Sequence, residues 1–428
     1  MKAVNREIIA LALPAIVSNI TTPLLGLIDV AIVGHFGAAA YLGAIAVGTT
    51  MFNMLYWLFA FLRMGTAGIA AQAHGAANEA EASATLRRGL VMAVGFGSLM
   101  LVLAVPLCGL ATWLLHVEAA VAPQAQAYFY IAIAGAPAVL GTYVLNGWLL
   151  GRQNTRLPMW VALMTNVANT ALSLSFVFGL GWRIEGVALG TALSQWLGFA
   201  VCLVATVRRY RPQAVVWSEL LRRSALVRLF RVNVHIFLRT LCLVAVTMWF
   251  TRRGGEFGVN VLAANALLMQ LFMFFSFFSD GFAFAAEALA GKAEGAGDRQ
   301  ALLAVERATL RRGLEVAIVF TVVYLLAGRW IVTLLTDVPA VVATAGEYLP
   351  WAVAVPLCGI LAFIYDGIFI GLTRTRAMLL SMFFAMVIYF AVERLLSPAL
   401  GNHALWLAFV LYLAARGVYL RFRFPRRP

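Results

Sequence analysis

The first long apolar stretch, residues 8–36, carries Leu24-Leu25-Gly26-Leu27-Ile28-Asp29-Val30-Ala31-Ile32-Val33 at its centre. A stretch of this length crosses a bilayer as a helix, and Pro14 and Pro23 are expected to kink it. Asp29 is the exception, because a charged and unpaired carboxylate at bilayer depth costs roughly 2.5 kcal/mol or more. It is tolerated if it faces a wet cavity, is paired, or is protonated. An acid poised between those states predicts a proton-coupled switch.

The composition of the whole chain is that of a membrane protein. Its 428 residues are 63% hydrophobic and 12% charged, whereas soluble domains carry about twice that charged fraction. Apolar runs long enough to span a membrane recur from end to end. Twelve spans are predicted, at 8–36, 42–73, 89–115, 119–150, 157–181, 186–207, 232–251, 259–290, 310–330, 341–371, 377–396 and 402–420. The expected fold class is therefore an all-α polytopic membrane protein.

The formal net charge of +14 does not indicate a nucleic-acid partner, because the basic residues gather on one side of the predicted membrane. With the N-terminus in the cytoplasm, most of the 32 Lys and Arg residues fall in cytoplasmic segments. The exceptions are five in outer segments and three within spans: Arg183, Arg252, Arg253, Arg329 and Arg394, and then Arg63, Arg239 and Arg416. This asymmetry follows the positive-inside rule, so both termini are predicted to be cytoplasmic.

Other classes of function find no support in the sequence. The apolar run behind the charged N-terminus is too long for a cleaved signal and is expected to remain as the first span. The four cysteines lie far apart, which suggests neither a disulfide framework nor a metal site. A Walker-A pattern, a serine elbow and a zinc-helix motif are all missing from the sequence. Neither an enzyme nor an ATP-driven pump is expected, although ATPase subunits could reside on separate chains, and no cofactor is expected beyond a coupling ion.

The chain contains an internal repeat. The sequence ATLRRGL at 84–90 recurs at 308–314, NGWLLG at 146–151 aligns with DGIFIG at 366–371, and Gly65 and Gly75 match Gly281 and Gly291. Two pseudo-symmetric lobes of six helices each are therefore predicted, at 1–209 and 232–428, related by an axis along the membrane normal. The segment 210–231 between them is expected to be a cytoplasmic amphipathic linker that contacts anionic headgroups.

Several motifs resemble those of the multidrug and toxic compound extrusion (MATE) family and its DinF-like branch. They are Leu42-Gly43-Ala44-Ile45-Ala46-Val47, Phe61-Leu62-Arg63-Met64-Gly65-Thr66 and Ala71-Gln72-Ala73-His74-Gly75 in the first lobe. In the second they are Ile236-Phe237-Leu238-Arg239-Thr240, Leu262-Ala263-Ala264-Asn265-Ala266 and Asp280-Gly281-Phe282-Ala283-Phe284-Ala285-Ala286-Glu287-Ala288. The resemblance covers essentially the whole chain. It implies a twelve-helix, two-lobe exporter with a central cavity, driven by H⁺ or Na⁺ rather than by ATP.

The resemblance also implies roles for single residues. The family's acid in the first span matches Asp29, and its kinking proline matches Pro14. Asn169 in the fifth span matches a polar site residue, and Thr191 in the sixth matches a hydroxyl partner. Ser173 stands where several relatives carry a second aspartate, and this loss of a carboxylate weakens a Na⁺ site. Asn169 and Ser173 share one helix face, although small polar residues also serve as contacts between helices.

Further charged residues within the predicted spans form a second group: Arg63, Arg239, Asp280, Glu287 and Asp366. Intramembrane charges pair with one another, so an ion-pair network is expected. It either locks one orientation of the lobes until substrate or proton breaks it, or it joins the helices permanently. Glu287 could instead reach the cytoplasmic interface beside Lys292. His235 stands where the resemblance implies an acid, and a histidine there either titrates or, as favoured, forms an interfacial hydrogen bond.

The sequence therefore predicts an ion-coupled secondary antiporter that exports amphipathic or cationic drugs and toxic compounds by alternating access. H⁺ is favoured over Na⁺, with Asp29 as the coupling group; the alternative is a structural acid paired permanently with Arg63 or Arg239. A flippase for lipids or lipid-linked precursors is the alternative function, in which the arginines would bind phosphate. The expected partners are small-molecule substrates and membrane lipids. The protein is expected to be a multi-pass monomer in the bacterial inner membrane.

Overall fold

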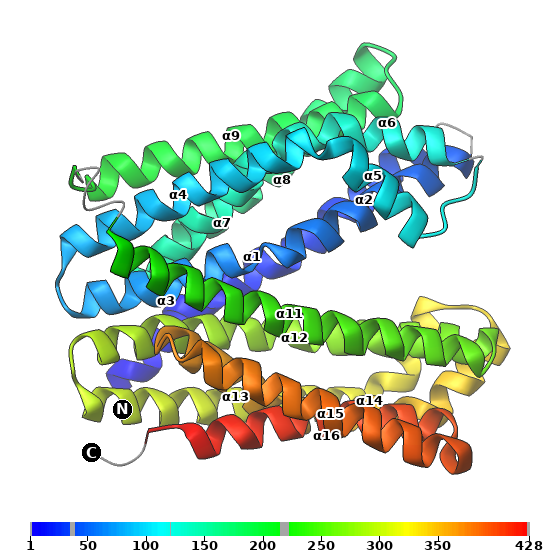
Figure 1. Cartoon of the computed structure of the whole chain (residues 1–428). Helices are drawn as coiled ribbons and strands as arrows, with labels where there is room; N and C mark the ends of the chain where they lie inside the picture. Colours follow the sequence, from blue (N-terminus) through cyan, green and yellow to red (C-terminus); the bar gives the residue numbers. More distant parts are fainter. Residues whose placement is uncertain (1, 35–38, 120, 215–221, 426–428) are drawn as a thin grey trace. The chain divides into compact units, whose positions relative to one another are not determined.

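The computed structural model describes residues 2–34, 39–119, 121–214 and 222–425, and for residues 2, 3, 22–34 and 39–42 it describes only the backbone. Within this part of the chain every regular element is a helix (Figure 1). The helices and the short turns between them follow the expected alternation of apolar runs and polar connections. An all-α polytopic fold, as predicted, is therefore confirmed.

The first half of the chain forms helices α1 to α9. They are α1 (Lys2–Gly34), α2 (Ala39–Leu58), α3 (Phe61–Gly75), α4 (Glu79–Val102), α5 (Ala104–Leu114), α6 (Ala122–Ala132), the 3₁₀ turn η1 (Ile133–Gly135), α7 (Ala136–Gly151), α8 (Arg156–Leu174), the π turn η2 (Ser175–Gly179) and α9 (Ile184–Tyr210). Asn78 starts α4, because its side chain accepts a hydrogen bond from the backbone of Glu81 at 2.9 Å. Arg211 ends α9 in the left-handed conformation with φ 44°.

The second half forms six helices without such interruptions. They are α11 (Arg223–Glu256), α12 (Val259–Gly295), α13 (Arg299–Leu335), α14 (Pro339–Gly371), α15 (Thr375–Leu400) and α16 (Asn402–Arg423). Asp298 caps α13 as Asn78 caps α4, by accepting a hydrogen bond from the backbone of Ala301 at 2.9 Å. Helix α13 leaves Leu325 and Leu326 exposed by 69% and 80%. An apolar surface of this kind fits a hydrocarbon environment.

The helices reproduce the predicted spans. Among the described residues, 11 helical stretches are long and apolar enough to cross a membrane. Together with α1, which carries the first predicted run, they correspond to the twelve predicted spans. Several spans of the first half are broken within their length: α2 gives way to α3, α4 to α5, and α6 to α7 through η1. The break at η1 precedes Pro137, which α7 accommodates in its first turn.

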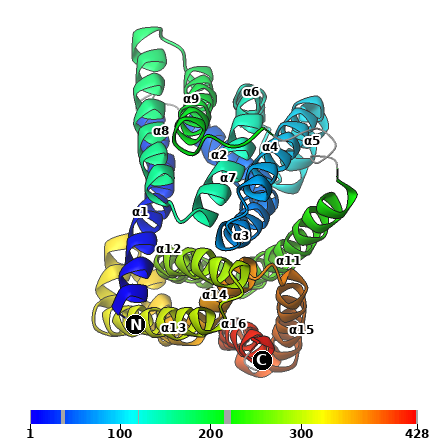
Figure 2. The ribbon, with the colours of Figure 1, turned by 90° about the vertical axis from the view of Figure 1, so that its left-hand side faces the viewer.

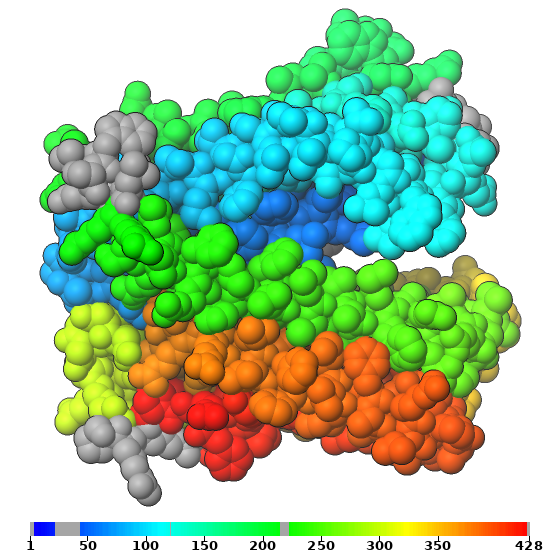
Figure 3. Space-filling model, viewed as in Figure 1, coloured from blue at the N-terminus to red at the C-terminus, as the bar shows by residue number. Residues whose placement is uncertain are grey.

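The chain divides into two compact units. One unit is Val17–Leu229, and the other is Phe230–Pro428 together with Met1–Ile16. The beginning of α1 thus packs within the second unit, and the first turns of α11 belong to the first unit. In the second unit α14 contacts α12, α13 and α16, and α15 lies along α16 (Figures 2 and 3). In the first unit α7 contacts α3 and α4, while α8 lies along α9.

Close glycine contacts reveal the repeat in both units. Gly147 on α7 packs against the carbonyl of Arg63 on α3, and Gly367 on α14 packs against the carbonyl of Ala283 on α12. A Cβ at either glycine would collide with that carbonyl oxygen. The same helix pair is therefore built twice, with small residues that let two backbones approach. Both residues of each equivalent pair are 220 positions apart.

The turns keep the same separation and correct part of the predicted alignment. Ala77 and Gly297, again 220 residues apart, have φ values of 51° and 67° just before the capped helices α4 and α13. The sequence matches of Gly65 with Gly281, Gly75 with Gly291, and 84–90 with 308–314 are shifted by four residues from this register. Four residues are about one helical turn, so similar residues recur on the same helix face. The repeat was predicted correctly, but its register at these positions was wrong.

Candidate transport site

Three predicted polar residues meet between α8 and α9 in the first unit. Asn169 and Ser173 on α8 are fully buried, and Asn169 Nδ2 donates to Thr191 Oγ1 on α9 at 3.0 Å. The helices approach closely because Gly190 faces Ser173, whose Oγ would lie 2.7 Å from a Cβ at that glycine. Asn169 Oδ1 and Ser173 Oγ make no hydrogen bond to any described residue. Buried polar atoms normally have a partner, so these two oxygens are candidates for contacting a ligand.

Two residues of the predicted coupling helix fall outside the described side chains. Asp29 and Pro23 belong to α1 by their backbone, but their side chains are not among those described. Helix α8 is nevertheless attached to α1, because Asn166 Nδ2 donates to the carbonyl oxygen of Thr21 at 3.1 Å. Pro14 lies in the part of α1 that packs within the second unit. There the neighbouring residue Ile16 contacts α12 beside Gly281.

Asp366 on α14 lies between two arginines inside the second unit. Its Oδ2 accepts hydrogen bonds from Arg239 on α11 and from Arg416 on α16, and all three residues are buried. The Arg416 guanidinium also lies over the Tyr412 ring, 5.3 Å from its centroid. Arg239 and Asp366 thus come together as intramembrane charges were expected to. Arg416 completes the cluster and was missing from the predicted site.

The other members of the predicted charged group lie on α3, α11 and α12. Arg63 is on α3 in the first unit, whereas Asp280 and Glu287 are on α12 in the second. Glu287 is fully buried, close to where Gly371 approaches its backbone carbonyl. His235 on α11 shares a hydrogen bond of 3.1 Å between its Nδ1 and Thr375 Oγ1 on α15. His235 therefore links two helices within the second unit.

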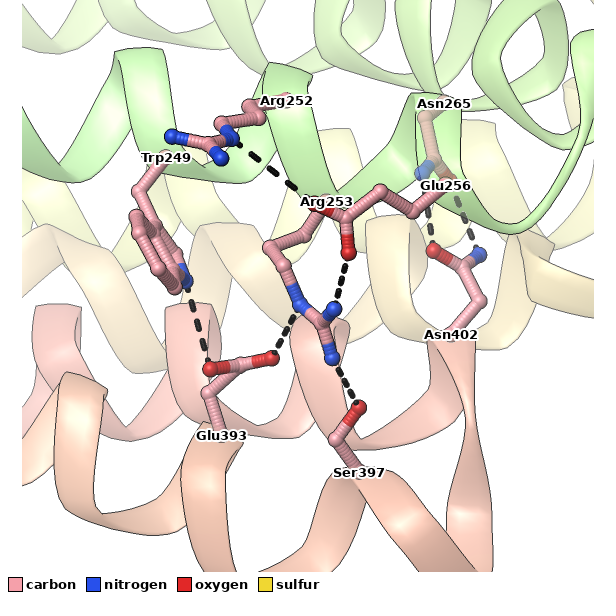
Figure 4. Close-up of polar contacts among 8 residues, drawn as sticks. All are labelled: Trp249, Arg252, Arg253, Glu256, Asn265, Glu393, Ser397 and Asn402. Atoms are coloured by element: carbon pink, nitrogen blue, oxygen red, sulfur yellow. Dashed lines mark hydrogen bonds and ion pairs between the residues drawn. The ribbon is translucent and has the colours of Figure 1, made fainter.

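Glu393 and Arg253 form a buried pair that the sequence analysis missed (Figure 4). Charges near the outer ends of the spans were interpreted as solvated, and this is wrong for Glu393, which is 1% exposed. Its Oε1 accepts from Arg253 Nε at 2.8 Å and its Oε2 from Trp249 Nε1 at 3.2 Å. Arg253 also donates to Ser397 Oγ at 2.9 Å and to Glu256. The signal in the sequence was the spacing of four residues within both Trp249–Arg253 and Glu393–Ser397.

Two more polar contacts join the helices of the second unit. Tyr365 on α14 donates to Glu306 Oε1 on α13 at 2.6 Å. Asn265 on α12 and Asn402 on α16 exchange hydrogen bonds of 2.8 and 3.0 Å, and Trp406 donates to the same Asn265 oxygen at 2.8 Å. These residues are buried. Their polar atoms are therefore satisfied within the protein, as packing requires.

Comparison with known proteins agrees with the repeat and with the helix order. The MatE family model matches the chain twice, over residues 14–174 and 234–394. The two matches begin and end 220 residues apart, like the paired glycines and turns. Each half of the chain is therefore one copy of the same family unit.

Individual relatives are similar over nearly the whole chain. The chain is 41% identical over 413 residues to the DNA damage-inducible protein F of Escherichia coli, covering 96% of this chain and 90% of that protein. It is 27% identical over 453 residues to a probable multidrug resistance protein NorM of Rhizobium meliloti, covering 98% and 93%. The crystal structure of a MATE protein in the bent conformation has the same fold, with a TM-score of 0.87 at 17% identity over 98% of this chain and 95% of that chain. The chain thus belongs to the multidrug and toxic compound extrusion family of membrane transporters and, within it, to the DinF-like branch.

Proposed function

We propose that this inner-membrane protein is a proton-coupled antiporter that exports amphipathic or cationic small molecules and acts as a monomer. The buried site of Asn169, Ser173 and Thr191 carries the proposal, because two of its oxygens have no described partner. Asp29 lies on α1, to which α8 is joined through Asn166. A site for a cation or proton beside a carboxylate fits this arrangement. The similarity to a probable multidrug resistance protein supports export of small molecules.

The residues of this site favour a proton over Na⁺ as the coupling ion. A metal cation needs several hard oxygen ligands, and Ser173 offers a hydroxyl where a second carboxylate would strengthen such a site. A proton needs a single acceptor, and Asp29 supplies a carboxylate. One carboxylate among neutral polar groups therefore fits proton binding better.

In the proposed cycle, a proton from outside neutralises Asp29 and removes the cost of its charge within the membrane. Helix α1 then bends near Pro14 or Pro23, and substrate leaves towards the outside. Loss of the proton to the cytoplasm resets the protein. One proton that moves down 100 mV and one pH unit supplies about 3.7 kcal/mol. This free energy sustains an electroneutral solute gradient of several hundredfold, since tenfold corresponds to about 1.4 kcal/mol.

Efflux of the cationic dye ethidium from reconstituted vesicles tests this function. An imposed pH gradient should drive efflux by the wild type, and an imposed Na⁺ gradient should not. Asp29→Asn should abolish the pH-driven efflux, because an amide cannot exchange the proton. The matched control Asp337→Asn alters an exposed aspartate in the connection between α13 and α14 and should leave efflux unchanged. Wild-type efflux by Asp29→Asn would refute the role of Asp29, and efflux driven only by Na⁺ would refute proton coupling.

Flipping of lipids or lipid-linked precursors is a second candidate, favoured by the cluster at Asp366. One carboxylate there faces Arg239 and Arg416, which leaves a net positive charge inside the second unit. A phosphate headgroup is an anion that two guanidinium groups recognise well. In vesicles with fluorescent phospholipid, a flippase would expose inner-leaflet headgroups to a membrane-impermeant quencher, and Arg416→Gln would slow this. Headgroup exposure equal to that of protein-free vesicles would exclude the flippase.

A further inference from the structure

The buried carboxylate of Glu393 has no part in the function proposed above, but the repeat gives it a position that does. Counting back 220 residues, Glu393 corresponds to Ser173 and Trp249 corresponds to Asp29. In the second unit the corresponding residues touch, since Trp249 Nε1 donates to Glu393 Oε2 at 3.2 Å. The first half therefore carries its carboxylate on the first helix of the repeat, and the second half carries it on the fifth.

We propose that Glu393 is a second proton-binding site, at which a proton and the Arg253 guanidinium exchange places on one carboxylate oxygen. The proposal rests on the proton-coupled transport proposed above and adds a second proton to each cycle. Arg253 is on α11 and Glu393 on α15, so the exchange connects or disconnects the ends of these two helices. The charge asymmetry of the chain predicts that this end faces outside.

The two oxygens of Glu393 have separate partners, which makes the exchange possible. Oε1 accepts from Arg253 Nε at 2.8 Å, and Oε2 accepts from Trp249 at 3.2 Å. A proton from the outer solution forms an O–H bond at Oε1 and replaces the hydrogen bond from Arg253. Oε2 keeps the Trp249 hydrogen bond in both states, because a carboxylic acid still accepts through its carbonyl oxygen. The proton is the sole chemical group transferred.

Arg253 has somewhere to go when it leaves Glu393. Glu256 lies three residues further along the same helix and already pairs with Arg253. The side chains of Arg253 and Glu256 are 22% and 45% exposed, so water reaches them while Glu393 is 1% exposed. The arginine can therefore keep a carboxylate partner without Glu393. A buried carboxylate without its cation is strongly unfavourable, and the proton removes that charge.

The other charged and titratable groups around Glu393 are engaged elsewhere. On α11, Arg252 lies 3.7 Å from Glu256. On its own helix, Tyr389 stands one turn before Glu393, and the Tyr389 ring lies 6.2 Å from that of Tyr412 on α16. Glu347 of α14 and His403 of α16 pair with each other at 3.3 Å. Among the described side chains, Arg253 is the cation that bonds Glu393, and this makes its exchange with a proton decisive.

The number of protons per cycle tests the proposal. Vesicles are held at zero membrane potential with a difference of one pH unit, and the ethidium concentration ratio is measured at steady state. Two protons per ethidium sustain a ratio of about 100, and one proton sustains about 10. The wild type should reach the first value, and Glu393→Gln should fall to the second. This ratio is independent of rate, so a merely structural role of Glu393 would slow transport without changing it.

Companion variants guard against a folding defect in Glu393→Gln. Glu393→Asp keeps a carboxyl group and should retain the ratio of about 100, whereas Arg253→Gln should fall to about 10 because Glu393 stays protonated. The matched control Glu315→Gln removes an exposed carboxylate that also pairs with two arginines, Arg311 and Arg312, and should keep the wild-type ratio. A wild-type ratio in either Glu393→Gln or Arg253→Gln would overturn the proposal.

The same measurement separates this proposal from the proposed function. If Asp29→Asn behaves like the wild type while Glu393→Gln loses a proton, the role of Asp29 fails and the role of Glu393 stands. If Asp29→Asn abolishes accumulation while Glu393→Gln keeps the wild-type ratio, the reverse holds. A wild type that does not accumulate ethidium against a pH gradient would overturn both.

Discussion

At the scale of single residues, burial separates two kinds of charged group in this protein. The arginines around Asp366 have left water and depend on one carboxylate, whereas the pairs of Glu315 with Arg311 and Arg312 remain exposed. Exposed ion pairs contribute less than about 1 kcal/mol. Removing one partner of a buried pair costs about 3–5 kcal/mol, because the remaining charge is left without compensation. The same charges in a sequence thus carry very different weight.

We therefore expect Asp366→Asn to destabilise the protein by about 3–5 kcal/mol, because Arg239 and Arg416 would lose their common counter-ion. Thermal unfolding of the purified protein in detergent measures the effect. Glu315→Gln is the control and should change the free energy of unfolding by less than about 1 kcal/mol. Equal melting temperatures for Asp366→Asn and the wild type would contradict the structural role assigned to this cluster.

At the scale of the elements, the helices follow from the apolar runs, and their contacts follow from small residues. Gly367 lets α14 touch the carbonyl of Ala283 on α12, as Gly147 does for α7 and α3. The spans were predicted from hydrophobicity alone, since each run is long enough to bury its backbone hydrogen bonds in lipid. The breaks at η1 and between α2 and α3 were not predicted, because an apolar run has the same composition whether or not the helix is continuous.

Gly367→Ala should destabilise the second unit by about 1–3 kcal/mol, since its Cβ would force α14 away from α12. Gly346 on the same helix offers a matched control, because a Cβ there meets no heavy atom within 4 Å among the described residues. Gly346→Ala should be neutral or stabilise the helix by up to about 1 kcal/mol. The melting temperatures of the two variants in detergent give the comparison, and a smaller loss for Gly367→Ala than for Gly346→Ala would disprove the packing argument.

At the scale of the whole molecule, the distribution of basic residues predicts the orientation in the membrane. Both termini should face the cytoplasm, and the connection at Asp337 should face outside. A cysteine introduced by Arg423→Cys should react with a membrane-impermeant maleimide only after the inner membrane is opened. A cysteine introduced by Asp337→Cys should react in intact spheroplasts. The opposite pattern would show that the orientation is inverted.

The sequence by itself determined the helical membrane fold, the number of spans and the repeat, because hydrophobic length and recurring motifs are local properties of the chain. It also determined which residues are unusual, such as Asp29 and Asp366 within apolar runs. Only the tertiary structure decided that Arg416 joins Asp366 and that Glu393 is buried against Arg253. These contacts join helices that are far apart in the sequence. A charge near the end of a span is solvated or buried according to which neighbouring helix covers it, and composition does not contain that information.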